Sequence, residues 1–224
     1  MRTIIKGTEP PDLTVWKGRN PHKKYKDLVG TEEGKIIRAT IRDYSLKEQF
    51  YLCAYCCQRI EDIDACHNEH VEAQSQNPRR TLDFSNIVAS CNTYNQCGDA
   101  HKSQHLPLTP LMAECEIELR FKISGRVEGL SNRAIDMIQV LNLGDHEKNN
   151  RALIEKRKQL SDVLLWSKGV DSNKGLEDED LLEMLIDDLS QSQLEQMDSF
   201  TPVVINILKG WLQSVRLTGL ISRF

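Results

Sequence analysis

The sequence predicts an α+β protein with a small metal-stabilised core. Two closely spaced cysteine pairs, Cys53 with Cys56 and Cys91 with Cys97, indicate the core. The run Ile117–Ile123 alternates apolar and charged residues, as a half-buried strand does. Several other stretches repeat apolar residues at helical spacing. With 224 residues, 39% hydrophobic and 28% charged, the chain has the composition of a globular protein of one or two domains.

Residues 1–32 place prolines and glycines among basic side chains, which predicts an irregular basic arm. Such an arm suits a phosphate backbone, and a solvated surface extension explains the charges equally well. From Glu33 to Phe50 the residues Ile37, Ile41 and Tyr44 recur at helical spacing. They predict an amphipathic helix that braces the core.

The core is expected over residues 33–110, with short strands and tight loops that end in a helix. An extension over 111–168 begins with the predicted strand, which turns at Ser124-Gly125. A linker is expected over 169–175, followed by a C-terminal region, 176–224. Four helices are predicted after the turn, each from apolar residues at helical spacing. The first is capped by Ser131 and carries Ile135, Ile138 and Leu141, and the second carries Leu153, Leu160 and Leu164. The third carries Leu182, Leu185 and Leu189, and the fourth begins at Thr201-Pro202 and carries Val204, Leu208, Trp211 and Val215.

Charge is distributed unevenly along the chain. Between Leu176 and Leu208 there are nine acidic residues and no lysine or arginine, so the remainder carries a net charge of +5 although the whole carries -4. A nucleic-acid partner for that remainder is therefore compatible with the composition. The sequence has no apolar run of membrane-spanning length and no signal-peptide pattern at its start, which predicts a cytosolic protein.

In a reducing cytosol, clustered thiols favour metal ligation over disulfides. Cys53-Ala54-Tyr55-Cys56 is a tight knuckle, and Cys91 follows Cys56 after 35 positions. Five residues separate Cys91 from Cys97, so the second knuckle is enlarged. Four thiolates suit a closed, structural Zn²⁺ site, the alternative being buried cysteines without a metal. The other thiols, Cys57, Cys66 and Cys115, are expected to pack or to lie at the surface.

Between the two pairs lies His67-Asn68-Glu69-His70, followed by the segment 81–88. A carboxylate beside an imidazole at a strand end can hold a hard cation while the imidazole acts as a base. Phosphodiester hydrolysis requires that division of roles. An adjacent Glu-His pair alone is common, and a surface or zinc-binding role explains it as well. The flanking cysteine pairs favour the catalytic interpretation.

The order Cys-x-x-Cys, His-x-Glu-His, Leu-Asp-x-Ser-Asn and a second cysteine pair resembles the HNH endonucleases, whose ββα-metal fold is held together by zinc. More closely, Met1-Arg2-Thr3-Ile4, the segment 82–91 and Leu141-Asn142-Leu143 resemble the Septu-type and retron-associated HNH nucleases of the PtuB family. The resemblance covers about residues 1–165. It implies a ββα-metal core with an N-terminal brace helix and a C-terminal helical elaboration.

The resemblance also assigns roles. His70 matches the general base, and Glu69 matches the ligand of a catalytic Mg²⁺ or Mn²⁺. Asn86 matches the middle letter of HNH and is expected to orient the loop and His70. His67 matches a first histidine of variable role, expected to support the site.

The chain departs from the family at the third letter, where it reads Cys97-Gly98-Asp99-Ala100-His101-Lys102. Asp99 aligns as the residue that completes the metal site, and His101 is the competing candidate if the helix starts later. A degenerate, inactive site is a third possibility. Lys102 is expected to contact a substrate phosphate, or else to be solvated.

The resemblance further implies a bacterial, cytoplasmic effector of antiphage defence that cleaves nucleic acid, with DNA favoured over tRNA. Its expected partner is an ABC-type ATPase (PtuA-like) in a hetero-oligomer, with a retron reverse transcriptase and its RNA–DNA product as further candidates. The acidic C-terminal segment is expected to face solvent, a basic protein surface or the nuclease's own groove. The competing functions are a zinc-knuckle module that binds nucleic acid without cutting it, and a structural adaptor.

Overall fold

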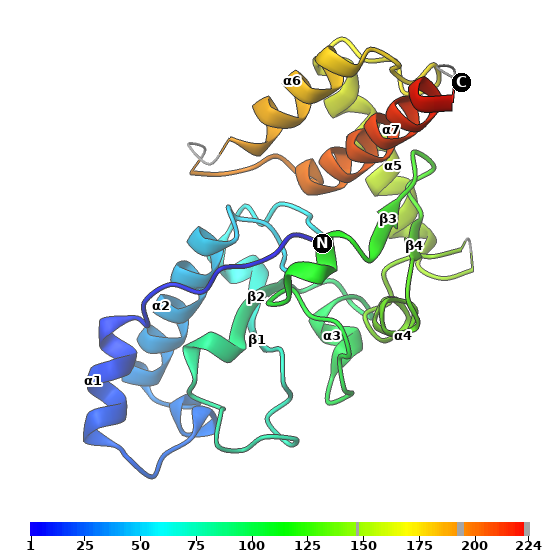
Figure 1. The fold of residues 1–224 in the computed structure, drawn as a ribbon. Coiled ribbons are helices and arrows are strands. Elements are labelled where there is room, and N and C mark those ends of the chain that lie inside the picture. Colours follow the sequence, from blue (N-terminus) through cyan, green and yellow to red (C-terminus); the bar gives the residue numbers. More distant parts are fainter. Residues whose placement is uncertain (147, 192–194, 222–224) are drawn as a thin grey trace.

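The chain folds as a mixed α+β protein, as predicted. The computed structural model describes residues 1–146, 148–191 and 195–221, and within them it contains seven α-helices and two small antiparallel β-hairpins (Figure 1). The elements are α1 (Pro11–Arg19), α2 (Glu32–Glu48), β1 (Cys66–His70), β2 (Ile87–Cys91), α3 (Gly98–His101), β3 (Leu119–Phe121), β4 (Val127–Gly129), α4 (Asn132–Val140), α5 (Arg151–Ser167), α6 (Glu179–Ser190) and α7 (Thr201–Ile221).

The N-terminal segment is more ordered than an irregular arm, so that part of the prediction was wrong. Helix α1 starts at Pro11, a residue whose fixed φ suits the first turn of a helix. Its Leu13 and Trp16 are buried together with Ile37 and Ile41 of α2. Burial of this short apolar stripe against α2 stabilises a helix that its composition alone does not predict.

Helix α2 braces the core, as predicted. Thr31 caps it by accepting a hydrogen bond from the backbone N–H of Gly34 at 3.0 Å. The helix packs against both strands of the β1–β2 hairpin, in which Cys66 pairs with Cys91 and His70 with Ile87. The hairpin and α3 follow one another along the chain as β, β and α.

The second hairpin is shorter than the strand predicted over 117–123. Only Leu119–Phe121 form β3, because residues 113–116 adopt a 3-10 turn that carries the chain into the strand. The predicted turn at Ser124-Gly125 is confirmed, with Gly125 at a φ of 81° and the Lys122 N–H donating to the Arg126 carbonyl. The predicted cap of α4 is also confirmed, because Ser131 accepts a hydrogen bond from Ala134.

The C-terminal helices form a second layer above the core (Figure 1). The predicted apolar stripes of α6 and α7 are buried against one another, with Leu182, Val204 and Leu208 fully enclosed. The acidic outer face of α6 is exposed, and Glu179 and Glu183 pair with Arg216 of α7. Residues 192–194 and 222–224 of the predicted 176–224 region lie outside the described residues.

The segment before α7 is tied to the cysteine-rich core by backbone hydrogen bonds. The Met197 N–H donates to the Phe50 carbonyl at 3.0 Å, and the Phe200 N–H donates to the Cys57 carbonyl at 2.8 Å. Phe200 is itself buried in the main apolar core. The C-terminal layer is therefore integrated with the first knuckle.

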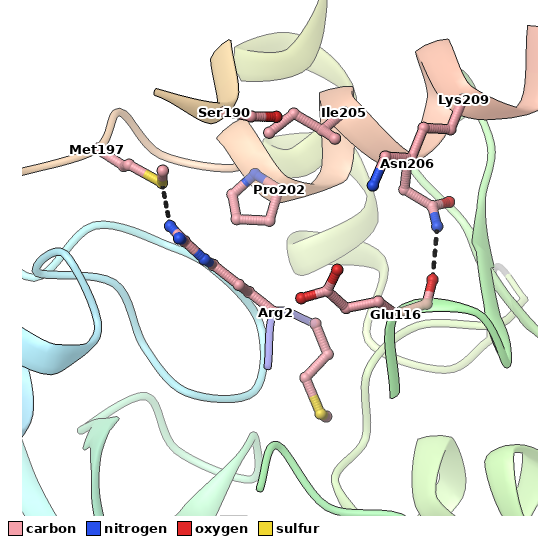
Figure 2. A pocket seen from close by; sticks show the side chains of 9 residues that line it. Arg2, Glu116, Ser190, Met197, Pro202, Ile205, Asn206 and Lys209 are labelled. Atoms are coloured by element: carbon pink, nitrogen blue, oxygen red, sulfur yellow. Dashed lines mark hydrogen bonds between the residues drawn. The ribbon is translucent and has the colours of Figure 1, made fainter. Parts of the chain in front are cut away.

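A pocket of about 260 Å³ lies where the N-terminal residues meet the C-terminal layer (Figure 2). Arg2 reaches across it to the Met197 sulfur, and the Asn206 amide of α7 bonds to the Glu116 carbonyl. None of the site residues predicted from the sequence lines this pocket. Among the described helices, none is both long and apolar enough to cross a membrane.

Candidate metal centre and active site

The four cysteines predicted to bind zinc come together in the core. Their Sγ atoms all lie within 4.8 Å of one another, and all four side chains are buried. A tetrahedral Zn²⁺ with bonds of about 2.3 Å places its sulfur ligands roughly 3.8 Å apart, so the cluster has the size of a closed four-sulfur site. The arrangement is consistent with a structural zinc site, as predicted.

Hydrogen-bond donors surround the sulfur atoms. The Cys91 N–H points at Cys53 Sγ at 3.4 Å, and the Gln96 amide at Cys91 Sγ at 3.8 Å. Hydrogen bonds from the Cys53 and Cys56 thiols lower the pKa of Cys91, which favours a thiolate at that position. Buried thiolates with N–H donors are the ligands that Zn²⁺ prefers, so the residues fit this ion.

The second group of polar side chains lies between the hairpin and α3. Glu69 is on β1, and its two carboxylate oxygens face two different imidazoles. Oε1 lies 2.5 Å from His101 Nδ1, and Oε2 lies 3.3 Å from His67 Nε2. The backbone of Gly98 lies so close that an added Cβ would stand 2.5 Å from His67 Nε2. Glycine at this position therefore lets α3 dock directly onto the group.

The outer nitrogen of each imidazole is held by a carbonyl oxygen. His67 Nδ1 lies 2.9 Å from Asn92 Oδ1, whose amide is oriented by donating to the Asp64 carbonyl at 3.1 Å. His101 Nε2 lies 2.7 Å from the Gln104 carbonyl oxygen. Because carbonyl oxygens only accept, both outer nitrogens carry protons, and in a neutral ring the inner nitrogens then carry lone pairs. Two lone pairs aimed at a carboxylate are favourable only where a proton or a cation lies between them.

The charge state of Glu69 follows from the same contacts. Burial favours the neutral acid, but hydrogen bonds from His101 and His67 outweigh it and lower the pKa of Glu69. Burial opposes protonation of His67 as well, and the hydrogen bonds to Glu69 and Asn92 nevertheless raise its pKa. The Glu69 carboxylate is therefore ionised and lies between two imidazoles, which is the donor set of divalent-cation sites built from a carboxylate and histidines.

His70, the predicted base, is the last residue of β1 and is buried. Its Nε2–H donates to the Thr81 carbonyl at 2.9 Å, and its ring stands edge-on to Tyr25 with 4.8 Å between the centroids. Burial lowers the pKa of His70, against the opposing effects of the Thr81 hydrogen bond and the Glu69 charge. The imidazole is thus neutral at pH 7, and Nδ1 holds the lone pair.

Asn86 and Asp99 both bond to backbone, in different loops. Asn86 accepts from the Glu72 N–H at 2.9 Å and donates to the Glu72 carbonyl at 3.0 Å, which clamps the chain just after His70. Asp99 is exposed and accepts from the Asn95 N–H at 2.6 Å, so it closes the enlarged second knuckle. The structure brings His101, and not Asp99, next to Glu69.

Lys102 directly follows α3 and is exposed, with a left-handed φ of 53°. It lines a groove of about 590 Å³ with amide side chains such as Gln104 and Asn142 and with the basic residues His146 and Lys148. Among the lining residues that the structure describes, which leave out Glu147, none is acidic. Polar grooves with amides and lysines suit a phosphate-bearing ligand.

Sequence reasoning missed Asn92, Thr81 and Gln104, whose oxygens fix the imidazole tautomers. It also missed Tyr55, which is fully buried; burial, together with the Glu69 charge, raises the pKa of its hydroxyl. Backbone carbonyls leave no trace in side-chain patterns. Of the three, only Asn92 could have been found from the sequence. It follows Cys91, which pairs with Cys66 at the start of β1, so its side chain lies near His67.

Comparison with known proteins adds no assignment. No family model matches the chain, and no curated protein matches it. The geometry of the site is therefore the basis for assigning a function.

Proposed function

We propose that the protein is a metal-dependent endonuclease of the HNH type that hydrolyses phosphodiester bonds. The observation that carries the proposal is the ionised Glu69 carboxylate held between His67 and His101, with the neutral imidazole of His70 on the adjacent residue. The zinc-sized cysteine cluster beside this group supports the proposal, because it fixes the hairpin and α3 relative to one another.

Glu69 and His101 are the proposed ligands of the catalytic divalent cation, with His67 as a third donor or as a support. Such a cation neutralises charge on the phosphate and on the leaving oxygen. His70 takes the proton of the attacking water on Nδ1, since Nε2 is committed to Thr81. Neighbouring side chains of a strand point to opposite faces, so the cation ligand Glu69 and the base His70 are on different sides of the end of β1.

His101 replaces Asp99 in this proposal because of helix geometry. Residues two apart on a helix point in nearly opposite directions, whereas residues three apart share a face. Gly98 and His101 share the face toward Glu69, and Asp99 points to the second knuckle. A site with imidazole donors favours Mn²⁺ or Ni²⁺ over Mg²⁺, in contrast to the oxygen-rich site that Asp99 would make.

The substrate is proposed to run from the cation group into the groove beside α3. Lys102 would meet a phosphate there, and Lys148 would meet another farther along the groove. Hydrolysis by water needs no ribose hydroxyl, so DNA is the favoured substrate and tRNA is the competing one. Helix α6 lies in the C-terminal layer, well separated from α3 (Figure 1), so its exposed acidic face does not oppose a strand in this groove.

The biological role that the resemblance suggests is antiphage defence with an ABC-type ATPase as partner. The exposed outer face of α6, with its carboxylates and the 60% exposed Met184, is a suitable surface for such a partner. Co-purification of the ATPase with the wild-type chain, and its loss on reversing the charges of Asp180 and Asp187, would support this contact. Retained binding would place the partner elsewhere.

The test of the proposed activity is cleavage of plasmid DNA and of tRNA in parallel by zinc-loaded protein, with Mg²⁺ or Mn²⁺ added. His70→Ala and His101→Ala are expected to abolish cleavage with zinc content unchanged. Asp99→Ala is expected to retain cleavage and to lose about 1 kcal/mol of stability, because it removes the exposed hydrogen bond from the Asn95 N–H.

Two outcomes contradict the assignment. Loss of cleavage in Asp99→Ala with activity retained in His101→Ala would make Asp99 the metal ligand. Binding of nucleic acid without cleavage under any divalent cation, unchanged by His70→Ala, would favour the zinc-knuckle binding module instead.

A further inference from the structure

Arg157 of α5 is completely buried, with 0% of its surface exposed, and it is the largest fully buried side chain of the described chain. A guanidinium is charged at any physiological pH, and burying a charge without a counter-charge is costly. The question is therefore which anion compensates Arg157.

Its direct contacts are neutral. Nη1 donates to the Gly125 carbonyl at 2.7 Å, and Nη2 donates to the Leu143 carbonyl at 3.0 Å. The guanidinium lies 5.2 Å from the centre of the Phe121 ring, and its buried Nε has no hydrogen-bond partner. Within residues 1–146, 148–191 and 195–221, no carboxylate forms an ion pair with Arg157. The carbonyls solvate the cation without neutralising it.

The segment that Arg157 binds also contacts the cysteine cluster. Leu141, two residues before Leu143, accepts the Cys97 N–H at 2.9 Å. Leu141, Leu143 and the four clustered cysteines belong to one apolar core. Burial lowers the pKa of Arg157 to about 10, and the thiols of Cys56, Cys57 and Cys97 are the groups whose charge opposes that decrease. Arg157 therefore stays protonated at neutral pH.

The cluster in turn needs positive charge. Zn²⁺ with four thiolates has a net charge of two negative units, and this unit would sit among fully buried side chains. The donors seen at the sulfur atoms, the Cys91 N–H and the Gln96 amide, are neutral. The four cysteines that would hold a dianionic zinc centre therefore lie near a buried cation that has no carboxylate partner among the described residues.

We propose that Arg157 is the counter-cation of the four-thiolate zinc centre and sets its affinity for the metal. The inference is independent of the proposed nuclease activity. It assigns a positioning and electrostatic role to a residue 60 positions after the last zinc ligand, one that no metal-binding motif includes. The competing explanation is a purely structural one, in which Arg157 only ties the Gly125 turn to Leu143.

Two substitutions separate charge from packing. Arg157→Met keeps much of the volume and removes the charge, whereas Arg157→Lys keeps the charge and loses the paired geometry. Leu153→Ala is the matched control, because Leu153 is 2% exposed in the same helix and core and carries no charge. Zinc affinity is measured on the full chain by competition with a chromogenic chelator.

Arg157→Met is expected to lower zinc affinity 10- to 100-fold beyond the effect of Leu153→Ala, with Arg157→Lys recovering most of the loss. Replacing Zn²⁺ by Co²⁺ gives a second readout, the energy of the thiolate-to-cobalt absorption band. Arg157→Met should shift this band, since a nearby positive charge stabilises the thiolate electrons, and Leu153→Ala should leave it unchanged. Equal affinity losses in Arg157→Met and Leu153→Ala with an unshifted cobalt band would overturn the proposal.

Discussion

Gly98→Ala tests the proposed cation site, because Gly98 of α3 lies directly against the side chains of His67 and Glu69. The added Cβ would lie 2.5 Å from His67 Nε2 and 2.8 Å from Glu69 Oε2, whereas ordinary contacts begin at 3.4 Å. The helix or the two side chains must therefore move by about 0.9 Å at the tightest contact. The atoms that must yield are side-chain ends held by Asn92 and His101, so the hydrogen bonds around Glu69 are the first to change.

A misplacement of about 1 Å costs roughly 100-fold in rate when it affects groups that position the reacting atoms. Gly98→Ala is therefore expected to lower cation-dependent cleavage about 100-fold and to weaken Mn²⁺ binding in calorimetry. Its zinc content should remain unchanged, and its free energy of unfolding should fall by up to about 2 kcal/mol, because the forced displacement costs about 1–3 kcal/mol and the better helix propensity of alanine recovers about 1 kcal/mol. Gly210→Ala on α7 is the matched control, since no atom lies within 4 Å of its added Cβ.

The reasoning would be refuted if Gly98→Ala bound Mn²⁺ and cleaved substrate like Gly210→Ala. Such a result would mean that the Glu69 group is not the reacting centre. Loss of zinc from Gly98→Ala would instead locate the damage in the cysteine cluster and make the comparison of rates meaningless.

Two further predictions concern stability. Hydrogen bonds from Arg133 and Ser131 lower the pKa of Glu118 to about 2 from an ordinary 4.5. The stabilising effect of the Glu118 charge is therefore complete above pH 4.5 and is lost as the pH falls toward 2. Glu118→Gln should flatten the decrease of the melting temperature between these pH values, and an unchanged slope would contradict this. Leu208→Ala removes a 0% exposed side chain from the α6–α7 cluster and should lower the free energy of unfolding in urea by about 2–5 kcal/mol. The control on the same helix is Leu217→Ala, whose side chain is 55% exposed and whose loss should cost less than about 0.5 kcal/mol. Equal losses would mean that the cluster is not a packed core.

The elements predicted from the sequence are those that local chemistry determines. The tight Cys53–Cys56 knuckle, the Ser131 cap and the stripes of α6 and α7 depend on residues a few positions apart, and the structure contains them all. Helix α1 was missed because its apolar stripe is short and its stability comes from α2. That contact joins segments 20 or more positions apart and leaves no periodic signal.

The sequence predicted which polar side chains gather beside Glu69, except that it favoured Asp99 over His101. His67, Glu69 and His70 could be identified because adjacent positions on a strand fix their relative directions. Asp99 and His101 could not be ranked, since the choice depends on which face of a four-residue helix meets the hairpin. That orientation is set by the close approach of Gly98 and by the enlarged knuckle that Asp99 closes, both of which are tertiary.

The backbone bonds from Met197 to Phe50 and from Phe200 to Cys57 have a consequence for synthesis on the ribosome. The Cys53–Cys56 knuckle emerges from the exit tunnel long before the residues that complete its hydrogen bonding. Contacts between such distant positions form late. An unfinished chain therefore holds an incomplete cysteine-rich core, and full assembly of the proposed nuclease waits until translation has passed Phe200.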